Sequence, residues 1–288
     1  MALPYFFGGL AKLNYDWLIR AQPMKLWLTT GGIEERFRFE IFQEPWTAYL
    51  FAWGGLLFDL AVVPLLLFRR TRIPVFLLAV GFHLNNAFMF KIGFFPWLMI
   101  FATLIFFPPD WPRRAKLFRP LERSRIGNKN VREPSRHQNL VLTLLALYVA
   151  VHFLLPFRHL LYPGPVDWTE EGHRFAWRMK LRDKRGEVRF AVVDHARRQV
   201  QMLENQELLL TRLQSLMMTH DPEMIRQFAC FLGSKFRRET GREVEIRAYT
   251  SLSLNGREPQ ALIDPDVDLT KARSSFLVSA DWIEPLEK

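Results

Sequence analysis

The sequence predicts an integral-membrane α-helical bundle of about five spans, followed by an extracytoplasmic α+β domain. Long apolar runs lie almost entirely within residues 1–158, whereas residues 159–288 carry charges every few positions. The net charge is +10, and its whole excess falls in residues 69–136, which hold 13 Lys and Arg against 3 Asp and Glu. This window consists of two basic loops around an apolar stretch, the pattern of loops that stay cytoplasmic. The charge therefore favours membrane lipid over nucleic acid as a partner.

A membrane-spanning helix needs about 20 apolar residues. Four segments meet or approach that length, and one of them, Val75 to Phe107, is long enough for two spans joined by a tight turn near Lys91. The first segment is the shortest and carries polar residues inside it. The predicted spans are Pro4 to Leu18, Trp46 to Phe68, the two halves of Val75 to Phe107, and Asn139 to Phe157.

The orientation follows from the basic loops, which we expect inside the cytoplasm. The spans then alternate consistently, the N-terminus lies inside, and the last span exports residues 159–288. Residues 21–45 become an outside loop, and they hold 3 Lys and Arg against 4 Asp and Glu, as the rule requires. The sequence therefore predicts a multi-pass membrane protein with two domains, 1–158 and 159–288.

The exported part alternates strand and helix patterns. Period-two alternation predicts strands at Trp177–Leu181 and Val188–Val192, with Lys184–Gly186 as their turn. Spacings of three and four predict helices over Gln206–Met218 and Pro222–Arg238, the second closed by Gly241. Further strands are expected at 243–254 and 261–263.

Lys12 is the sharpest candidate for chemistry. An ionisable group inside a span costs about 2.5–3.5 kcal/mol on insertion scales, so it calls for a partner or a function. Asp16 follows one helical turn later on the same predicted face. Lys12 is then either one half of an ion pair with Asp16, or a lysine that snorkels to the membrane surface, or a desolvated amine that acts as a base.

A second cluster, His83 with Asn85 and Asn86, lies in the middle of a predicted span. Such residues often only join neighbouring helices by hydrogen bonds. Alternatively they line a pocket for a polar head group within an apolar wall. Asp59, which follows Gly54-Gly55, is a weaker case of the same kind.

The exported domain offers a dense polar and aromatic segment from Trp168 to Trp177, which includes Glu170 and His173. The two tryptophans are either a buried pair or a recognition surface. No metal site is expected, because Cys230 is the only cysteine and the histidines are scattered. The alternating Asp264, Asp266 and Asp268 lack the glycine and the glutamate that a calcium loop requires.

Taken together, these segments resemble the vitamin K-dependent gamma-glutamyl carboxylase family, in the same order along nearly the whole chain. Residues 5–17 are similar to the family's active-site helix, and further matches follow in the spans and in the exported domain. The matching stretches are 5–17, 54–60, 82–86, 92–95, 109–113, 136–138, 155–159, 168–169, 175–177 and 263–268.

The resemblance implies that Lys12 is the base that deprotonates vitamin K hydroquinone or a related quinol. Oxygen then adds to the quinol anion and yields a strong base that removes a γ-proton from glutamate, and carbon dioxide traps the carbanion. The residues implied in binding the quinol are His83, Asn86 and Asp59. Those implied in binding a glutamate-containing protein or peptide are His159, Trp168, His173 and Trp177. No metal is implied.

Three departures from the family bear on function. His173 stands about where the animal enzyme has a tyrosine, which leaves the substrate open. The chain starts at the active-site helix, without the spans that precede it in the family, so we expect a truncated homologue in which Cys230 is a free thiol. The alternative function is a non-catalytic membrane protein of the same fold that binds a quinone or a lipid. A transporter is not favoured, because the sequence shows no inverted repeat.

Overall fold

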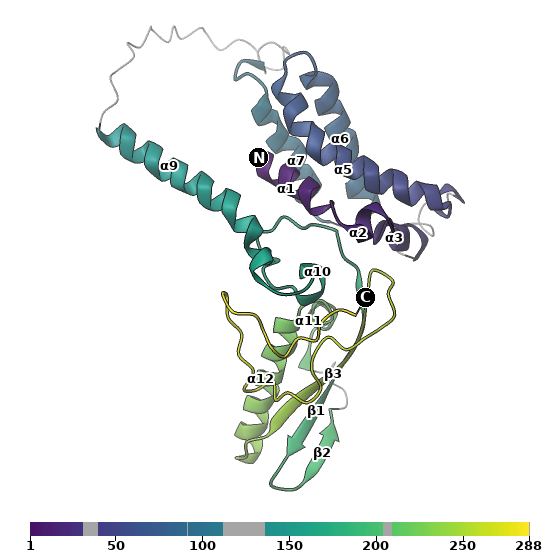
Figure 1. The fold of residues 1–288 in the computed structure, drawn as a ribbon, viewed down its shortest axis with the longest axis vertical. Coiled ribbons are helices and arrows are strands. Elements are labelled where there is room, and N and C mark those ends of the chain that lie inside the picture. The colour runs from purple at the N-terminus through teal and green to yellow at the C-terminus, as the bar shows by residue number, and fades with distance from the viewer. Residues whose placement is uncertain (31–39, 91, 112–135, 204–208, 288) are drawn as a thin grey trace. The chain divides into compact units, whose positions relative to one another are not determined.

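The computed structural model describes residues 1–30, 40–90, 92–111, 136–203 and 209–287. The chain divides into two compact units, each of which is treated by itself below (Figure 1). The helical unit consists of Met1–Leu10 and Gly54–Leu155, and the mixed unit consists of Ala11–Trp53 and Pro156–Lys288.

The helical unit packs four helices around an apolar core. Its described helices are α1 (Ala2–Ala11), α5 (Pro45–Leu67), α6 (Arg72–Met89), α7 (Phe95–Thr103) with the short 3-10 helix η2 (Leu104–Phe106), and α9 (Arg136–Leu154). Helices α1, α5, α6 and α7 contribute the buried side chains Tyr5, Phe58, Val62, Leu66, Val75, Ala79 and Met99.

The first basic loop, Arg69–Arg72, joins α5 to α6. The last carbonyls of a helix have no partner within the helix and need donors from elsewhere. The Thr71 hydroxyl donates to the carbonyl of Leu65 at 2.6 Å, and Nε of Arg72 donates to that of Leu66 at 2.9 Å. Residues of the loop thus cap the helix that precedes them.

Two of the described helical segments, Pro45–Leu67 and His137–Leu161, are long and apolar enough to cross a membrane, judged by length and composition. The shorter segments Ala2–Ala11 and Phe95–Phe106 are apolar as well. The stretch 75–107 does form two helices, α6 and α7. Five spans therefore stay a prediction. The turn residue Lys91 lies outside the described residues, and so does the predicted second basic loop, Arg113 to Arg136, except for Arg136, which begins α9.

The prediction of one continuous helix over Pro4–Leu18 is wrong. Helix α1 ends at Ala11, Lys12 lies in a turn, and α2 (Tyr15–Leu18) is a separate helix. Asn14 accounts for the break. Its Nδ2 donates to the carbonyl of Ala11 at 2.8 Å, and its Oδ1 accepts from the backbone N–H of Trp17 at 2.9 Å. One side chain thus caps the end of one helix and the start of the next.

The mixed unit is built on a three-stranded antiparallel sheet with the order β2-β1-β3. The central strand is β1 (Lys184–Asp194), and its neighbours are β2 (Gln199–Met202) and β3 (Glu245–Leu254). The helices α11 (Arg212–Met218) and α12 (Pro222–Thr240) follow β2 in the chain, and α12 packs against the sheet (Figure 1).

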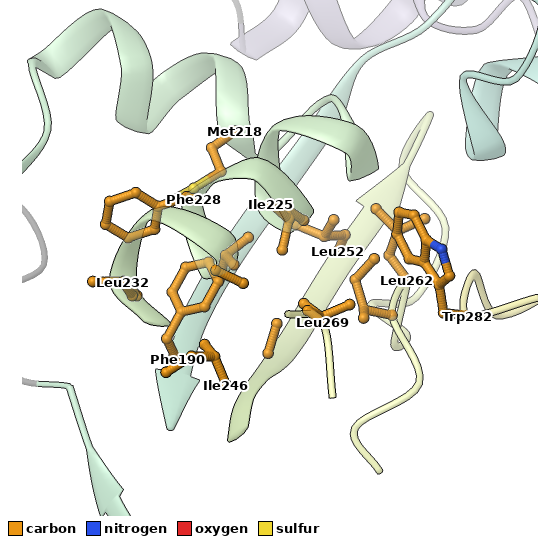
Figure 2. Packing of buried hydrophobic residues seen from close by; sticks show 14 of the residues in the cluster. Phe190, Met218, Ile225, Phe228, Leu232, Ile246, Leu252, Leu262, Leu269 and Trp282 are labelled. Atoms are coloured by element: carbon orange, nitrogen blue, oxygen red, sulfur yellow. The ribbon is translucent and has the colours of Figure 1, made fainter. Parts of the chain in front are cut away.

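Figure 2 shows the core between α12 and the sheet. Phe190 of β1 and Phe228 of α12 meet edge to face, with ring centroids 5.1 Å apart. Spacings of three and four along α12 bring Ile225 and Leu232 to the same side as Phe228, as the sequence predicts. Trp168, Leu262, Leu269 and Trp282 belong to the same cluster.

The predicted hairpin at the start of this domain is wrong. Residues 177–181 are not a strand, and Lys184–Gly186 lies within β1 instead of forming a turn. Trp177 and Lys180 both have φ of 55°, which no strand accommodates. Gly186 lets β3 approach closely, because a Cβ there would lie 2.0 Å from the carbonyl oxygen of Ser251.

The later elements follow the prediction more closely. Helix α12 ends at Gly241, whose φ of 72° gives the left-handed cap. Strand β3 lies within the predicted 243–254, and Ile263 forms an isolated antiparallel bridge with Ile283. Helix α11 lies within the predicted helix 206–218, although residues 204–208 fall outside the described part of the chain.

The remaining helices of the mixed unit are short. They are α2, α3 (Met24–Thr30), η1 (Glu40–Phe42), η3 (Leu155–Leu161) and α10 (Val166–Thr169). Helix α3 packs against the C-terminal part of the chain, because the indole of Trp27 donates to the carboxylate of Asp183 at 2.6 Å. A segment of the predicted outside loop 21–45 therefore folds together with the predicted exported domain.

Candidate active site

Lys12 lies in the turn between α1 and α2 and is half-buried. Its Nζ stands 5.4 Å from the centroid of the Trp17 ring, within the range of a cation–π contact. Trp17 is buried, and its indole N–H donates to the carbonyl of Ala52 at 2.7 Å. The ring is therefore a fixed platform beside the amine.

The sequence predicted Lys12 and Asp16 on one continuous helix, but in the structure Asp16 belongs to the separate helix α2. Its carboxylate accepts two hydrogen bonds from the guanidinium of Arg257, at 2.7 and 2.8 Å, and one from Asn255 at 2.9 Å. Arg20 contacts the same carboxylate at 3.3 Å. The principal partners of Asp16 thus come from residues about 240 positions further along the chain.

His83 lies buried in the helical unit, in a polar cluster with Tyr5. The phenol oxygen of Tyr5 is 2.7 Å from Nε2 of His83 and 3.3 Å from the hydroxyl of Thr103. Two stacked rings, Phe58 and Phe82, stand next to the imidazole, with centroids 3.9 Å apart. The cluster thus consists of three polar side chains beside two aromatic rings.

The two other residues implied in binding the quinol, Asp59 and Asn86, belong to the same unit as His83. Asp59 is buried on α5, where the backbone of α1 comes close: a Cβ on Gly9 would lie 3.3 Å from the Asp59 side chain. Asn86 is half-buried on α6, three positions after His83, and so shares its helix face.

A buried ionic cluster underlies the predicted glutamate-recognition segment of the mixed unit. The Lys184 side chain is completely buried, and its ammonium donates to the carbonyls of Trp168 and His220 and to Oε1 of Glu170, at 2.6, 2.9 and 2.8 Å. An ammonium has three N–H groups, so all are satisfied. Burial lowers the pKa of Lys184, and the adjacent Glu170 carboxylate opposes that shift.

The same carboxylate also holds Arg182, whose Nε lies 2.6 Å from Oε1 of Glu170. The Arg182 guanidinium contacts Nε2 of His173 in turn. The same Nε2 lies 3.2 Å from the carbonyl of Arg178, so it accepts from Arg182 in one tautomer of the ring and donates to that carbonyl in the other. Burial, with a contribution from Arg182, lowers the pKa of His173 to about 4, which agrees with a neutral ring.

The segment that carries these groups has an unusual backbone. Four residues other than glycine adopt positive φ within eleven positions: Glu170, Phe175, Trp177 and Lys180. Such conformations cost about 1–3 kcal/mol each and persist only where the surroundings enforce them. Two hydrogen bonds from Arg178 to Asp167, at 3.1 and 2.6 Å, tie the segment to α10.

Among the four predicted substrate-binding residues, the structure places His159 against the segment that carries His173. A Cβ on Gly172 would lie 2.5 Å from Cα of His159, so His159 packs directly against the turn that leads into His173. Trp168 is fully buried in the core, its indole donating to the carbonyl of Glu284 at 2.8 Å. Trp177 is half-buried in the same segment.

Two models of known families match successive parts of the chain. A family model described as HTTM domain matches residues 1–111. A second, described as vitamin K-dependent gamma-carboxylase, lumenal domain, matches residues 137–288. The chain belongs to the vitamin K-dependent gamma-carboxylase family. No solved structure matches this family member.

Sequence reasoning missed several residues that the structure of this gamma-carboxylase family member places at the candidate sites. Arg257 and Asn255 had no local signal, because their partner Asp16 lies near the other end of the chain. Lys184 was assigned to a turn, where a charged residue needs no partner. Tyr5 lies in the motif of residues 5–17 but only its contact with His83 marks it as part of a cluster.

In the described part of this gamma-carboxylase homologue, no group of three or more His, Cys, Asp or Glu side chains is arranged to hold a metal ion. Two of the three alternating aspartates pair with basic side chains, Asp266 with Arg247 at 3.1 Å and Asp268 with Lys271 at 3.0 Å, and Asp264 accepts the backbone N–H of Asp266 at 2.9 Å. Cys230 is a free, half-buried thiol.

Proposed function

We propose that this chain is a carboxylase-type membrane enzyme that couples oxidation of a reduced quinone to γ-carboxylation of protein-bound glutamate. The observation that carries the proposal is the match of both family models, in order, along one chain. When bound, the quinol supplies the electrons that reduce molecular oxygen, and this drives removal of the glutamate γ-proton and its replacement by carbon dioxide.

Lys12 is the proposed base, which takes the proton of the quinol hydroxyl on its Nζ. The resemblance of residues 5–17 to the family's active-site helix supports this role, and so does the setting of the amine. The amine lies in the turn between α1 and α2, where Asn14 caps the end of one helix and the start of the other, and it lies against the fixed ring of Trp17. A base held by such contacts needs little reorganisation to meet its proton donor.

The polar cluster of the helical unit fits the head group of a quinol. A flat ring with two hydroxyl groups requires aromatic walls and a few hydrogen-bonding groups inside an apolar site. The stacked Phe58 and Phe82 provide the wall, and His83 provides an imidazole with Tyr5 as its partner. We propose that His83, Asn86 and Asp59 bind the quinol.

The ionic cluster of the mixed unit fits the carboxylate of a glutamate side chain. Lys184 and Arg182 together carry two positive charges against the single carboxylate of Glu170, which leaves an excess that favours an anion. Lys184 is fully covered, whereas Arg182 and His173 keep about a fifth and a quarter of their side chains exposed. These two residues would therefore meet the substrate, and the buried Trp168 would support them.

We further propose the multi-pass topology with the C-terminal domain outside the cytoplasm. The name of the matched domain, lumenal, and the packing of α3 against Asp183 both support placing residues 21–30 and the C-terminal domain on one side of the membrane. Protease added to oriented vesicles should cleave residues 159–288 only from the outer face. Cleavage from the cytoplasmic face alone would overturn this topology.

Lys12→Ala in the full chain, assayed in membranes, tests the base. Quinone epoxidation and glutamate carboxylation should both fall at least about a hundredfold, because general-base catalysis contributes about that much. Lys12→Arg should not restore them, since a guanidinium stays protonated. Lys25→Ala is the matched control, as Lys25 is an exposed lysine of the same unit. Epoxidation at the parent rate in Lys12→Ala would refute the assignment.

Arg182→Gln tests glutamate recognition. We expect KM for a glutamate-containing peptide to rise about tenfold, with no change in KM for the quinol, because one charge-assisted hydrogen bond is lost. Arg189→Gln is the control, since Arg189 is an exposed arginine of β1 that pairs with Glu187. A parent chain that bound quinone but neither epoxidised nor carboxylated would favour the non-catalytic alternative.

A further inference from the structure

The Lys12 turn cannot hold its own shape. Helix α2 has four residues, and a single helical turn is unstable in isolation because its nucleation cost is not repaid by further hydrogen bonds. Its position must therefore come from contacts with other segments. Among the described residues, contacts from distant segments include the bond of the Trp17 indole to Ala52, that of the Tyr49 hydroxyl to the carbonyl of Ile19, and the three bonds that Asn255 and Arg257 donate to the Asp16 carboxylate.

Arg257 makes the strongest of these contacts. It donates Nη1 to Oδ2 and Nη2 to Oδ1 of Asp16, at 2.7 and 2.8 Å, the two-pronged geometry in which both partners fix each other's orientation. Asp16 keeps 14% of its side chain exposed and Arg257 keeps 26%, so water competes little for the pair. With both oxygens already engaged, the Asp16 carboxylate is not placed to act as an acid or a base itself.

Asn255 links the Asp16–Arg257 pair to the backbone that follows the recognition segment. It is buried immediately after β3, with φ of 52°, and its Nδ2 donates to Asp16 at 2.9 Å. Its Oδ1 accepts the backbone N–H of Asp183 at 2.8 Å, and Nδ2 also reaches the carbonyl of Leu181. Asp16 is thus anchored to the backbone at Leu181 and Asp183, between the recognition segment, 168–177, and β1.

We propose that Asp16 is a positioning residue for Lys12, and that Arg257 and Asn255 are the groups through which it acts. By clamping the first turn of α2 onto the C-terminal domain, they set where the Lys12 amine lies four residues earlier. The inference rests on the proposed role of Lys12 as the base. It adds that the domain carrying the glutamate-recognition segment also fixes the position of that base.

The experiment combines Asp16→Asn, Arg257→Gln and the double variant in the full chain. The matched control is the ion pair between Arg242 and Asp194, which lies in the same unit, is similarly exposed at 30% and 9%, and belongs to the far end of β1. Its variants are Asp194→Asn and Arg242→Gln. For each protein we would measure kcat, KM for the peptide, thermal unfolding, and the rate at which an amine-reactive reagent labels Lys12, with Lys25 as the internal reference.

Asp16→Asn and Arg257→Gln should each lower kcat about tenfold, because small displacements of a catalytic group are costly, and should change KM for the peptide less than about twofold. Labelling of Lys12 relative to Lys25 should change several-fold, and the double variant should be no worse than the singles. The control variants should alter neither kcat nor Lys12 labelling, whatever they do to thermal unfolding.

Two results would overturn the proposal: parent values of kcat and Lys12 labelling in Asp16→Asn, or an equal loss in the control variants, which would reveal only a general loss of stability. Failure of the base assignment is separately visible. If Lys12→Ala kept parent activity while Asp16→Asn still changed the labelling of Lys12, the clamp would stand and the proposed base would not.

Discussion

Replacing Lys184 by Met should destabilise the mixed unit by about 3 kcal/mol, because it breaks a buried ion pair from one side. Methionine fills much of the same volume, but the carbonyls of Trp168 and His220 lose their donor and Glu170 loses one of its cations. Three charge-assisted hydrogen bonds of about 1.5–3 kcal/mol each would sum to more. Arg182 still neutralises Glu170, which places the expected loss at the lower end of the range for broken buried pairs.

Hydrogen exchange of the full chain, followed by mass spectrometry on the peptide that covers β1, measures this loss. A change of about 3 kcal/mol corresponds to exchange about a hundredfold faster, if β1 opens with its unit. Lys235→Met is the matched control, since Lys235 pairs with Glu239 on the surface of α12 with both side chains more than a third exposed. Such a pair contributes about 0.3–0.5 kcal/mol, so its loss should change exchange about twofold.

Similar exchange rates in Lys184→Met and Lys235→Met would refute the reasoning, since the cluster would then contribute no more than a surface pair. Adding Glu170→Gln to Lys184→Met should recover part of the loss, because the uncompensated carboxylate is removed together with its partner. A double variant less stable than Lys184→Met alone would show that Glu170 has a stabilising role beyond this ion pair.

Two further outcomes follow from the same region. Folding lowers the pKa of His173 from 6.5 to about 4, so its contribution to stability is complete above about pH 6.5 and should decline by about 3 kcal/mol as the pH drops toward 4. His173→Gln should therefore make the free energy of unfolding less dependent on pH in this range. An unchanged slope would contradict a buried neutral ring. Gly172→Ala should destabilise the unit by more than the roughly 1 kcal/mol expected for Gly241→Ala. Both glycines have left-handed φ, but only at Gly172 would the added Cβ clash with His159. Equal losses of stability in thermal unfolding would contradict that close contact.

Several features could be predicted from the sequence alone because they depend on local periodicity or on amino-acid chemistry. The amphipathic pattern of α12 and the cap at Gly241 are of this kind, and the structure confirms both. So is the long apolar helix α5, which ends at the basic loop Arg69–Arg72. The order of the family's motifs along the chain also indicated the family, which the family models confirm.

The tertiary structure alone decided the features that depend on residues far apart in the sequence. A Lys12–Asp16 ion pair was one interpretation of the sequence, because the two residues are four positions apart, but Asn14 breaks the helix between them and Asp16 binds Arg257. The alternating pattern around Trp177 suggested a strand, but the positive φ values of this segment depend on the contacts around Glu170 and were invisible in the pattern. Local propensities specify helices and caps, whereas the partner of a buried charge is chosen by whichever distant segment the fold brings to it.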